Sequence, residues 1–267
     1  MMAHSFRNKT VVITGACAGI GRALSQRFGM AGARIALIDL NREQIATCVD
    51  HLESRGIQAR GYVCDVSDQK GVHETMNRIV EDFQHIDVLV NNAGITHRSL
   101  FEDTDAEVHH RLMAVNYFGA LYCTRESLPA LLQSHGLVIT MSSMSGFAPL
   151  RFRSAYSASK HALHGLFNCL RVELIDRGVD VMMVCPGFTA TDIYKNALQG
   201  DGGIVKKPFT LSGKTASPAD VAEEIFVGAI KRKRLLLLSN VDWRARLFAR
   251  FFPVFFERYL AHRIGGM

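Results

Sequence analysis

The sequence predicts a single α/β domain with a doubly wound Rossmann fold, in which a seven-stranded parallel sheet is flanked by helices and followed by a C-terminal helical extension. Short β-branched runs alternate with longer amphipathic stretches, which is the pattern of buried parallel strands joined by helices. The 267 residues are 48% hydrophobic and 21% charged. This composition supports one large core and excludes a disordered chain.

The expected strands are the short apolar runs at residues 10–14, 34–39, 59–64, 86–91, 137–142, 179–185 and 235–239. The amphipathic stretches between them predict helices at residues 20–31, 42–55, 69–83, 107–134, 154–177 and 218–231. Right-handed crossovers in this order place helices on both faces of the sheet.

We expect the catalytic domain at residues 1–240 and the extension at 241–267. Residues 189–217 break the alternation because they are long and weakly periodic, which predicts a mobile loop over a site. A surface excursion with no such role is the alternative.

A glycine-rich turn follows the first strand and precedes the first helix. Glycine lets the backbone turn tightly and approach a pyrophosphate, whose charge then rests on the helix N-terminus. Such turns also arise only to pack a helix on a strand, but the strand–turn–helix order favours a nucleotide. The expected cofactor contacts in the turn are Gly15, Cys17, Ala18, Gly19, Ile20 and Gly21.

Asp39 ends the second strand, where a carboxylate can accept hydrogen bonds from the adenosine ribose. Its charge would repel a 2′-phosphate, so we expect NAD in preference to NADP. Leu40 follows it in the same ribose region. Capping of the next helix is an alternative role for Asp39, and Arg42 is placed to support some NADP binding.

Tyr156 and Lys160 are four residues apart in a predicted helix and therefore share one face. Ser143 follows the fifth strand. Ligands bind α/β sheets at the carboxyl ends of the strands, so these three residues predict the reaction centre.

With these motifs, residues 7–240 resemble the short-chain dehydrogenase/reductase family, whose members have a TGxxxGxG turn and a YxxxK active site. Ala18 and Leu40 stand where NADP-preferring members often carry other residues, which supports NAD. The other positions that match the family are Asp65, Val66, Asn91, Asn92, Ala93, Gly94, Asn116, Pro186, Gly187 and Thr191.

The resemblance implies that Tyr156 is the general acid/base and that Lys160 binds the nicotinamide ribose. A neighbouring ammonium and an oxidised nicotinamide would both lower the tyrosine pKa from its reference value near 10. Ser143 would stabilise charge on the substrate oxygen. Asn116 would hold a water that links Lys160 to solvent. The structural alternatives are a capping serine and a solvent-facing asparagine.

By the same resemblance, Asp65 and Val66 flank the adenine. Thr191 meets the carboxamide. The remaining expected cofactor contacts are Asn92, Ala93, Gly94, Pro186, Gly187 and Thr189. The Asn91–Asn92 pair also has a structural alternative, which is to bond the backbone of neighbouring strands.

The leading hypothesis is an NAD-dependent oxidoreductase that acts on a lipophilic secondary alcohol or ketone, such as a steroid, retinoid or lipid. The alternatives are an NADPH-dependent carbonyl reductase and a nucleotide-binding membrane or protein-interaction module without turnover. An apolar pocket is expected from Met144, Phe147, Leu150, Phe152, Phe188 and Ile193, with Arg151 and Arg153 at its rim. The family resemblance further implies a homodimer or homotetramer.

The net charge of +6 is concentrated near the C-terminus. Residues 231–267 contain nine lysines and arginines and two acidic residues, whereas the rest contains 22 basic and 23 acidic residues. Aromatic residues and arginines alternate over residues 243–263, and Pro253 should divide this segment into two helices. Packing on the protein or in a dimer and peripheral membrane contact both remain open, and nucleic-acid binding is not expected.

We expect no catalytic metal, because the eleven histidines lack a plausible ligand set. The six cysteines contain no C-x-x-C pair and suit reduced, buried thiols. The N-terminus lacks an apolar signal segment, and no run is long enough to span a bilayer. A cytoplasmic location follows, with peripheral membrane association left open.

Overall fold

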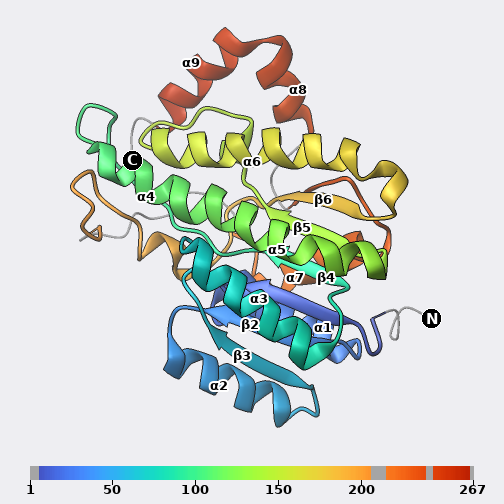
Figure 1. Ribbon diagram of the computed structural model, residues 1–267. Helices are drawn as coiled ribbons and strands as arrows, with labels where there is room; N and C mark the ends of the chain where they lie inside the picture. The colour runs from blue at the N-terminus through green and yellow to red at the C-terminus, as the bar shows by residue number, and fades with distance from the viewer. Residues whose placement is uncertain (1–5, 206–214, 239–242, 265–267) are drawn as a thin grey trace.

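The computed structural model describes residues 6–205, 215–238 and 243–264. In this part of the chain, seven parallel strands form one sheet in the order β3-β2-β1-β4-β5-β6-β7 (Figure 1). This confirms the predicted Rossmann-type fold. The strands are β1 (Thr10–Thr14), β2 (Arg34–Asp39), β3 (Ala59–Val63), β4 (Val88–Asn91), β5 (Leu137–Met141), β6 (Asp180–Cys185) and β7 (Leu235–Leu237).

Helices cover both faces of the sheet (Figure 1). One face packs against α1, α2 and α7, and the other against α3, α5 and α6. The helices of the described chain are α1 (Gly19–Met30), α2 (Arg42–Glu53), α3 (Gln69–Phe83), α4 (Ala106–Met113), α5 (Gly119–Ser134), α6 (Ser154–Glu173), α7 (Pro218–Ile230), α8 (Trp243–Phe251) and α9 (Pro253–Ile264).

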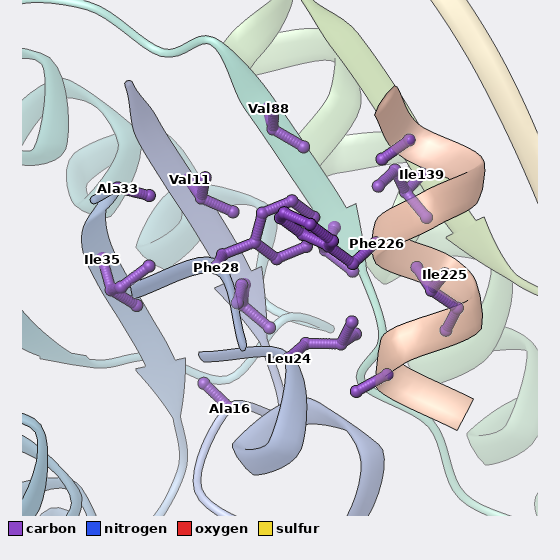
Figure 2. Close-up of a cluster of buried hydrophobic side chains, with 14 of the residues drawn as sticks. Val11, Ala16, Leu24, Phe28, Ala33, Ile35, Val88, Ile139, Ile225 and Phe226 are labelled. Atoms are coloured by element: carbon purple, nitrogen blue, oxygen red, sulfur yellow. The ribbon is translucent and has the colours of Figure 1, made fainter. Parts of the chain in front are cut away.

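The central parts of the strands are apolar because successive side chains enter two different cores. Val11 and Ile13 of β1 enter the core beneath α1 and α7, whereas Val12 between them enters the opposite one. Phe28 of α1 and Phe226 of α7 meet in the first core, with ring centroids 5.4 Å apart (Figure 2). This contact locks together two helices that are far apart in sequence.

The chain reverses its direction of winding beside β1. That strand pairs with β2 on one side and with β4 on the other, so the connections that leave the carboxyl ends of β1 and β4 diverge to opposite faces. A crevice forms where they part, and open α/β sheets bind their ligands there.

The predicted helix at 107–134 is one rod with a local distortion. A π-turn at Ala114–Phe118 separates α4 from α5 and contains Asn116. Such a turn inserts one extra residue and often marks a functional position, so a simple 3.6-residue pattern could not reveal it.

The predicted loop at 189–217 is anchored where it is described. Thr189 forms a bridge with Ala216, and Leu198 forms one with His97. Residues 206–214, on which the expectation of a mobile lid depends, lie outside the described residues.

The C-terminal extension forms two helices as expected, and Pro253 starts the second. Figure 1 shows α8 and α9 as an arch outside the layers of the domain, beyond α6. In the described part of the chain, no helix is long and apolar enough to cross a membrane.

Candidate active site

The glycine-rich turn at the end of β1 has a backbone that requires glycine. Gly15 has φ +60°, and a Cβ on Gly21 would lie 2.0 Å from the Gly15 carbonyl oxygen. The turn ends at Ala18, whose side chain cannot accept hydrogen bonds from the first amide groups of α1. Those amides carry the positive end of the helix dipole, so the turn fits the pyrophosphate of a dinucleotide.

Asp39 contacts this turn directly. Its carboxylate accepts hydrogen bonds from the backbone N–H groups of Cys17 (3.0 Å) and Leu40 (2.8 Å). Asn41 is the residue that caps α2, since its side chain accepts from the N–H of Gln44. The carboxylate therefore contacts the glycine-rich turn and does not act as the helix cap.

Arg42 is the first residue of α2 and is exposed, as is Leu40. Burial and the nearby Asp39 carboxylate raise the pKa of the Cys17 thiol. Cys17 is therefore a neutral part of the turn.

A cavity leads from this turn to the predicted reaction centre. Thr191 lines the end of the cavity nearest the turn. A Cβ atom built on Gly19 would lie 3.0 Å from the side-chain methyl group of Thr191. Lys160 lines the far end of the cavity. The lining residues are Ile20, Asn92, Gly94, Met141, Ser142, Ser143, Tyr156, Lys160, Pro186, Gly187, Thr189, Thr191, Ile193 and Tyr194. The cavity is placed to hold the nicotinamide half of a dinucleotide.

A second cavity adjoins the first. Ser143 and Tyr156 belong to both walls, so a molecule in either cavity contacts the same two hydroxyl groups. Its lining residues are Thr96, Ser143, Met144, Ser145, Leu150, Arg153, Tyr156, Pro186, Gly187, Phe188, Ile193 and Tyr194. Of the residues expected to form an apolar pocket, Phe147 and Phe152 are outside this lining.

Tyr156 and Lys160 lie on one face of α6, as their spacing predicted. The Lys160 ammonium nitrogen lies 5.7 Å from the centre of the Tyr156 ring and donates a 2.8 Å hydrogen bond to the Met141 carbonyl oxygen. Ser143 hydrogen-bonds to Tyr156 through its side chain. It also accepts from the N–H of Ser145 at 3.2 Å, so it has the capping role as well.

Burial dominates the ionisation of this group. It raises the pKa of Tyr156 to about 12, although the hydrogen bond from Ser143 and the positive charge of Arg153 both lower it. It also lowers the pKa of Lys160 to about 8. The Lys160 ammonium group, which is expected to lower the tyrosine pKa together with an oxidised nicotinamide, is held by the Met141 carbonyl oxygen.

Asn116 is buried and its amide is fully engaged. The side-chain oxygen accepts from the Ile95 N–H at 2.9 Å, and the side-chain nitrogen donates to the Ile95 carbonyl at 3.0 Å and to the Ser159 hydroxyl at 2.9 Å. It therefore does not face solvent. It ties the loop that follows β4 to α6, the helix that carries Tyr156 and Lys160.

The Asn91–Asn92 pair makes structural bonds. The Asn91 amide donates to the Thr124 hydroxyl at 2.8 Å, and the Asn92 amide donates to the Thr14 and Gly15 carbonyls at 2.9 and 3.0 Å. Asn92 still lines the cofactor cavity, so its structural and cofactor roles are compatible.

Two further expected contacts lie after β3. Asp65 is exposed and accepts from the Ser67 N–H at 2.9 Å, while Val66 is buried against Gly119. Neither residue belongs to the two cavities of the reaction centre. Ala93 is half-buried beside Gly15. A Cβ atom built on Gly15 would lie 3.0 Å from the Ala93 Cα.

Arg153 occupies a different place from the one the sequence suggested. It is buried in the wall of the second cavity with only 9% of its surface exposed, whereas Arg151 is exposed and outside the lining. Its guanidinium donates to the Thr96 hydroxyl at 2.6 Å and to the His97 carbonyl at 2.8 Å.

Thr96 and Tyr194 are lining residues that sequence reasoning missed. Thr96 follows the Asn91–Gly94 motif closely, and this proximity was the available signal. Tyr194 lies in the irregular loop, so no periodicity could place it.

Comparison with known proteins identifies the family. The family model for short chain dehydrogenases matches residues 9–202. The chain belongs to the short-chain dehydrogenase family. It is 35% identical over 265 residues to dehydrogenase/reductase SDR family member 7B of Bos taurus, covering 96% of this chain and 82% of that protein. It is 30% identical over 257 residues to dehydrogenase/reductase SDR family protein 7-like of Drosophila melanogaster. That match covers 93% of this chain and 79% of that protein.

Solved structures agree with the fold of this short-chain dehydrogenase. A Burkholderia phymatum short-chain dehydrogenase/reductase in complex with NAD superposes with a TM-score of 0.81 at 23% identity, covering 95% of this chain and 96% of that one. An alcohol dehydrogenase from Thermococcus sibiricus complexed with 5-hydroxy-NADP superposes with a TM-score of 0.75 at 24% identity, covering 86% of this chain and 95% of that one.

This short-chain dehydrogenase is thus an NAD(P)-dependent oxidoreductase. Within its described residues, no group of three His, Cys, Asp or Glu side chains is placed to hold a metal ion. None of the six cysteines forms a disulfide, and all except Cys169 are buried.

Proposed function

We propose that this enzyme transfers a hydride between NAD(H) and a secondary alcohol or ketone on a lipophilic molecule. The observation that carries the proposal is the shared wall of the two cavities, where Ser143 and Tyr156 line both. A hydroxyl pair at this boundary can contact the oxygen of a carbon that exchanges a hydride with the neighbouring ring.

When bound, the cofactor accepts or supplies the hydride at its nicotinamide ring. In the oxidation direction, Tyr156 takes the proton of the substrate hydroxyl, and in reduction it returns a proton to the carbonyl oxygen. Ser143 donates a hydrogen bond to the same oxygen and stabilises the charge that develops there. The buried Tyr156 needs positive charge nearby to ionise, and Lys160 and Arg153 are the cations on its two sides.

Lys160 has two further roles in the proposal, which are to bind the nicotinamide ribose and to relay protons. With a pKa of about 8, it can release a proton close to neutral pH. The Asn116 amide is occupied by protein groups. A relay water at this position would therefore be held by the main chain of the π-turn rather than by the Asn116 side chain.

The preference for NAD rests on Asp39. Its carboxylate lies beside the turn, 3.0 Å from the Cys17 nitrogen, where the adenosine ribose of a bound dinucleotide belongs. A 2′-phosphate at this position would face a negative charge. Arg42 is exposed nearby and is the residue through which an NADPH-dependent carbonyl reductase, the alternative function, would operate.

The second cavity defines the proposed substrate. Met144, Leu150, Phe188 and Ile193 provide apolar walls, and Arg153 provides a positive charge. No aspartate or glutamate is among the described lining residues. We therefore expect a largely apolar substrate with one hydrogen-bond acceptor that faces Arg153.

We also propose a homodimer or homotetramer that forms through α4–α5 and α6. Large apolar side chains are exposed on or directly after these helices, namely Phe118, Val172 and Ile175. Burial of such side chains between copies would be favourable.

The test is the variant Tyr156→Phe, which removes one oxygen atom and keeps the ring. We expect turnover of apolar secondary alcohols with NAD⁺ to fall at least ~10³-fold, because general acid/base catalysis is lost, while the Kd for NADH changes less than about 3-fold. Nicotinamide absorbance and fluorescence measure the two quantities.

Tyr122→Phe, outside both cavities, is the matched control and should keep full turnover. Retained turnover in Tyr156→Phe would reject the mechanism. NADH binding without turnover on any alcohol or ketone would favour the second alternative, a nucleotide-binding interaction module.

A further inference from the structure

The two C-terminal helices carry a surface that the proposed function does not use. Seven large apolar side chains on α8, on α9 and at the residue between them are each 43–71% exposed. We call them the hairpin patch, and its members are Leu247, Phe248, Phe251, Phe252, Val254, Phe255 and Tyr259. Large apolar side chains that are exposed together in one short segment mark an interaction site.

Packing inside the hairpin leaves the patch uncovered. Phe248 contacts Phe252 and Phe256, with ring centroids 5.4 and 6.1 Å apart. Phe256 is only 6% exposed, and among residues 247–261, whose side chains the structure describes, it is the one large apolar residue that is buried. The described aromatic side chains of this segment are therefore mainly exposed.

The charge of the same segment is strongly positive. Residues 243–264 contain five arginines and one glutamate, while the chain before residue 231 is nearly neutral. Segments that lie at a lipid–water boundary typically combine exposed aromatic residues with arginines. The aromatic rings enter the acyl region, and the guanidinium groups contact the lipid phosphates.

We propose that α8 and α9 dock this enzyme on the surface of a membrane that contains anionic phospholipids. The helices have 9 and 12 residues, so each is too short to span a bilayer and would lie along its surface. This inference depends on the hairpin patch and on the arginines of the same segment, and it does not require the proposed reaction.

The charge also argues against the hairpin patch as a contact with a second copy. A twofold contact places the same surface on both sides, so each arginine-rich hairpin would face another of equal positive charge. An anionic headgroup layer instead complements the arginines while the apolar side chains leave water.

The experiment uses the full chain and its own reporter. Trp243 is the only tryptophan in the sequence and begins α8, so its fluorescence reports on the hairpin without a label. The protein is titrated with vesicles of phosphatidylcholine alone and with vesicles that also contain about 30 mol% phosphatidylglycerol. We expect a blue shift and co-sedimentation with the anionic vesicles, at least ~10-fold stronger than with neutral ones.

Two sets of variants separate the apolar and the charged contributions. Phe251→Ser with Phe255→Ser should weaken vesicle binding at least ~10-fold. Arg250→Gln with Arg258→Gln should weaken it about 10- to 30-fold on anionic vesicles and little on neutral ones. Phe101→Ser is the matched control, because Phe101 is 74% exposed outside the hairpin, and it should bind like the unmodified chain.

NADH binding should be unchanged in every variant, which shows that the domain is folded. Unchanged tryptophan emission and no co-sedimentation with anionic vesicles would overturn the proposal. If Phe251→Ser with Phe255→Ser instead converts an oligomer to a monomer in light scattering and vesicle binding is absent, the hairpin patch is a contact between copies.

Discussion

Asp39 is the residue at which one charge controls the choice of cofactor. The variant Asp39→Asn keeps an oxygen to accept from the Cys17 N–H and removes the negative charge. We expect the ratio of kcat/KM for NAD⁺ to that for NADP⁺ to fall about 10- to 100-fold, which corresponds to ~1–3 kcal/mol of electrostatic repulsion. Steady-state kinetics with both cofactors measure this ratio.

Arg42→Gln is the paired control for Asp39. Removal of this exposed cation should weaken NADP⁺ and shift the ratio in the opposite direction. A ratio that does not change in Asp39→Asn would show that the carboxylate has no influence on the 2′ position of the ribose.

His97 makes stability depend on pH. It is fully buried, both ring nitrogens lack a hydrogen-bond partner, and burial together with Arg153 and His109 lowers its pKa from 6.5 to about 4. Between these values the unfolded chain binds a proton that the folded chain does not, so the free energy of unfolding falls as pH falls through this window.

The variant His97→Leu should remove that part of the pH dependence. Its free energy of unfolding, relative to the unmodified chain, should rise as pH falls from 6.5 towards 4, by at most about 1.4 kcal/mol per pH unit. Urea unfolding at several pH values tests this. The exposed neighbour His110, changed to Gln, serves as control, and equal pH dependence in His97→Leu and the unmodified chain would contradict the explanation.

At the scale of single residues, residue type and spacing predicted which residues form the site better than they predicted which groups those residues contact. The spacing of Tyr156 and Lys160 places them on one face, because helix geometry depends only on sequence separation. The hydrogen bonds of Asn116 and the burial of Arg153 depend on segments far away in the chain, so no local pattern could reveal them.

Among the elements, α7 holds the first core together through one ring. Phe226 contacts Phe6 and Phe28, with ring centroids 5.4 Å away in each case, and Arg27 lies over its face. The variant Phe226→Ala leaves a cavity between α1 and α7 (Figure 2). We expect it to lower the free energy of unfolding by about 3–5 kcal/mol.

Denaturant unfolding measures this loss for Phe226→Ala, and Phe101→Ala is the surface control, with an expected change within about 0.5 kcal/mol. A similar small change for both variants would mean that the ring cluster does not stabilise the contact between α1 and α7.

Sequence patterns located nearly every element because strands and helices here differ in length and periodicity. They failed where the backbone departs from regular geometry. The π-turn at Ala114–Phe118 reads as ordinary helix in sequence, and the bridge between Leu198 and His97 pairs segments without strand patterns.

For the whole molecule, the fold predicts how a cofactor changes thermal stability. A ligand that binds only the folded state adds about 2.7 kcal/mol at a concentration of 100 Kd, which for a domain of this size raises Tm by roughly 5–8 °C. We expect this shift with NADH. The variant Gly15→Val should abolish it, because its side chain would collide with Ala93.

Differential scanning fluorimetry gives Tm with and without NADH for both proteins, each compared with its own unliganded value. A full shift in Gly15→Val would show that the dinucleotide does not lie against the turn.

The fold class itself was predictable, since alternation of strands and helices with right-handed crossovers leaves few topologies. The exposed position of the hairpin patch was not, because amphipathic periodicity gives a helix its apolar face but does not say what covers it.

The pairing of β1 with β4 also determines the order in which the chain can fold. Val11 of β1 pairs with Val88, and the Thr10 N–H donates to the Asp87 carboxylate at 2.8 Å. While the chain is being synthesised, β1 can pair with β2 long before β4 leaves the ribosome. One hydrogen-bonding edge of an apolar strand is open during that interval, and such edges recruit other chains. The nascent N-terminal half is therefore the stage at which this enzyme most needs a chaperone.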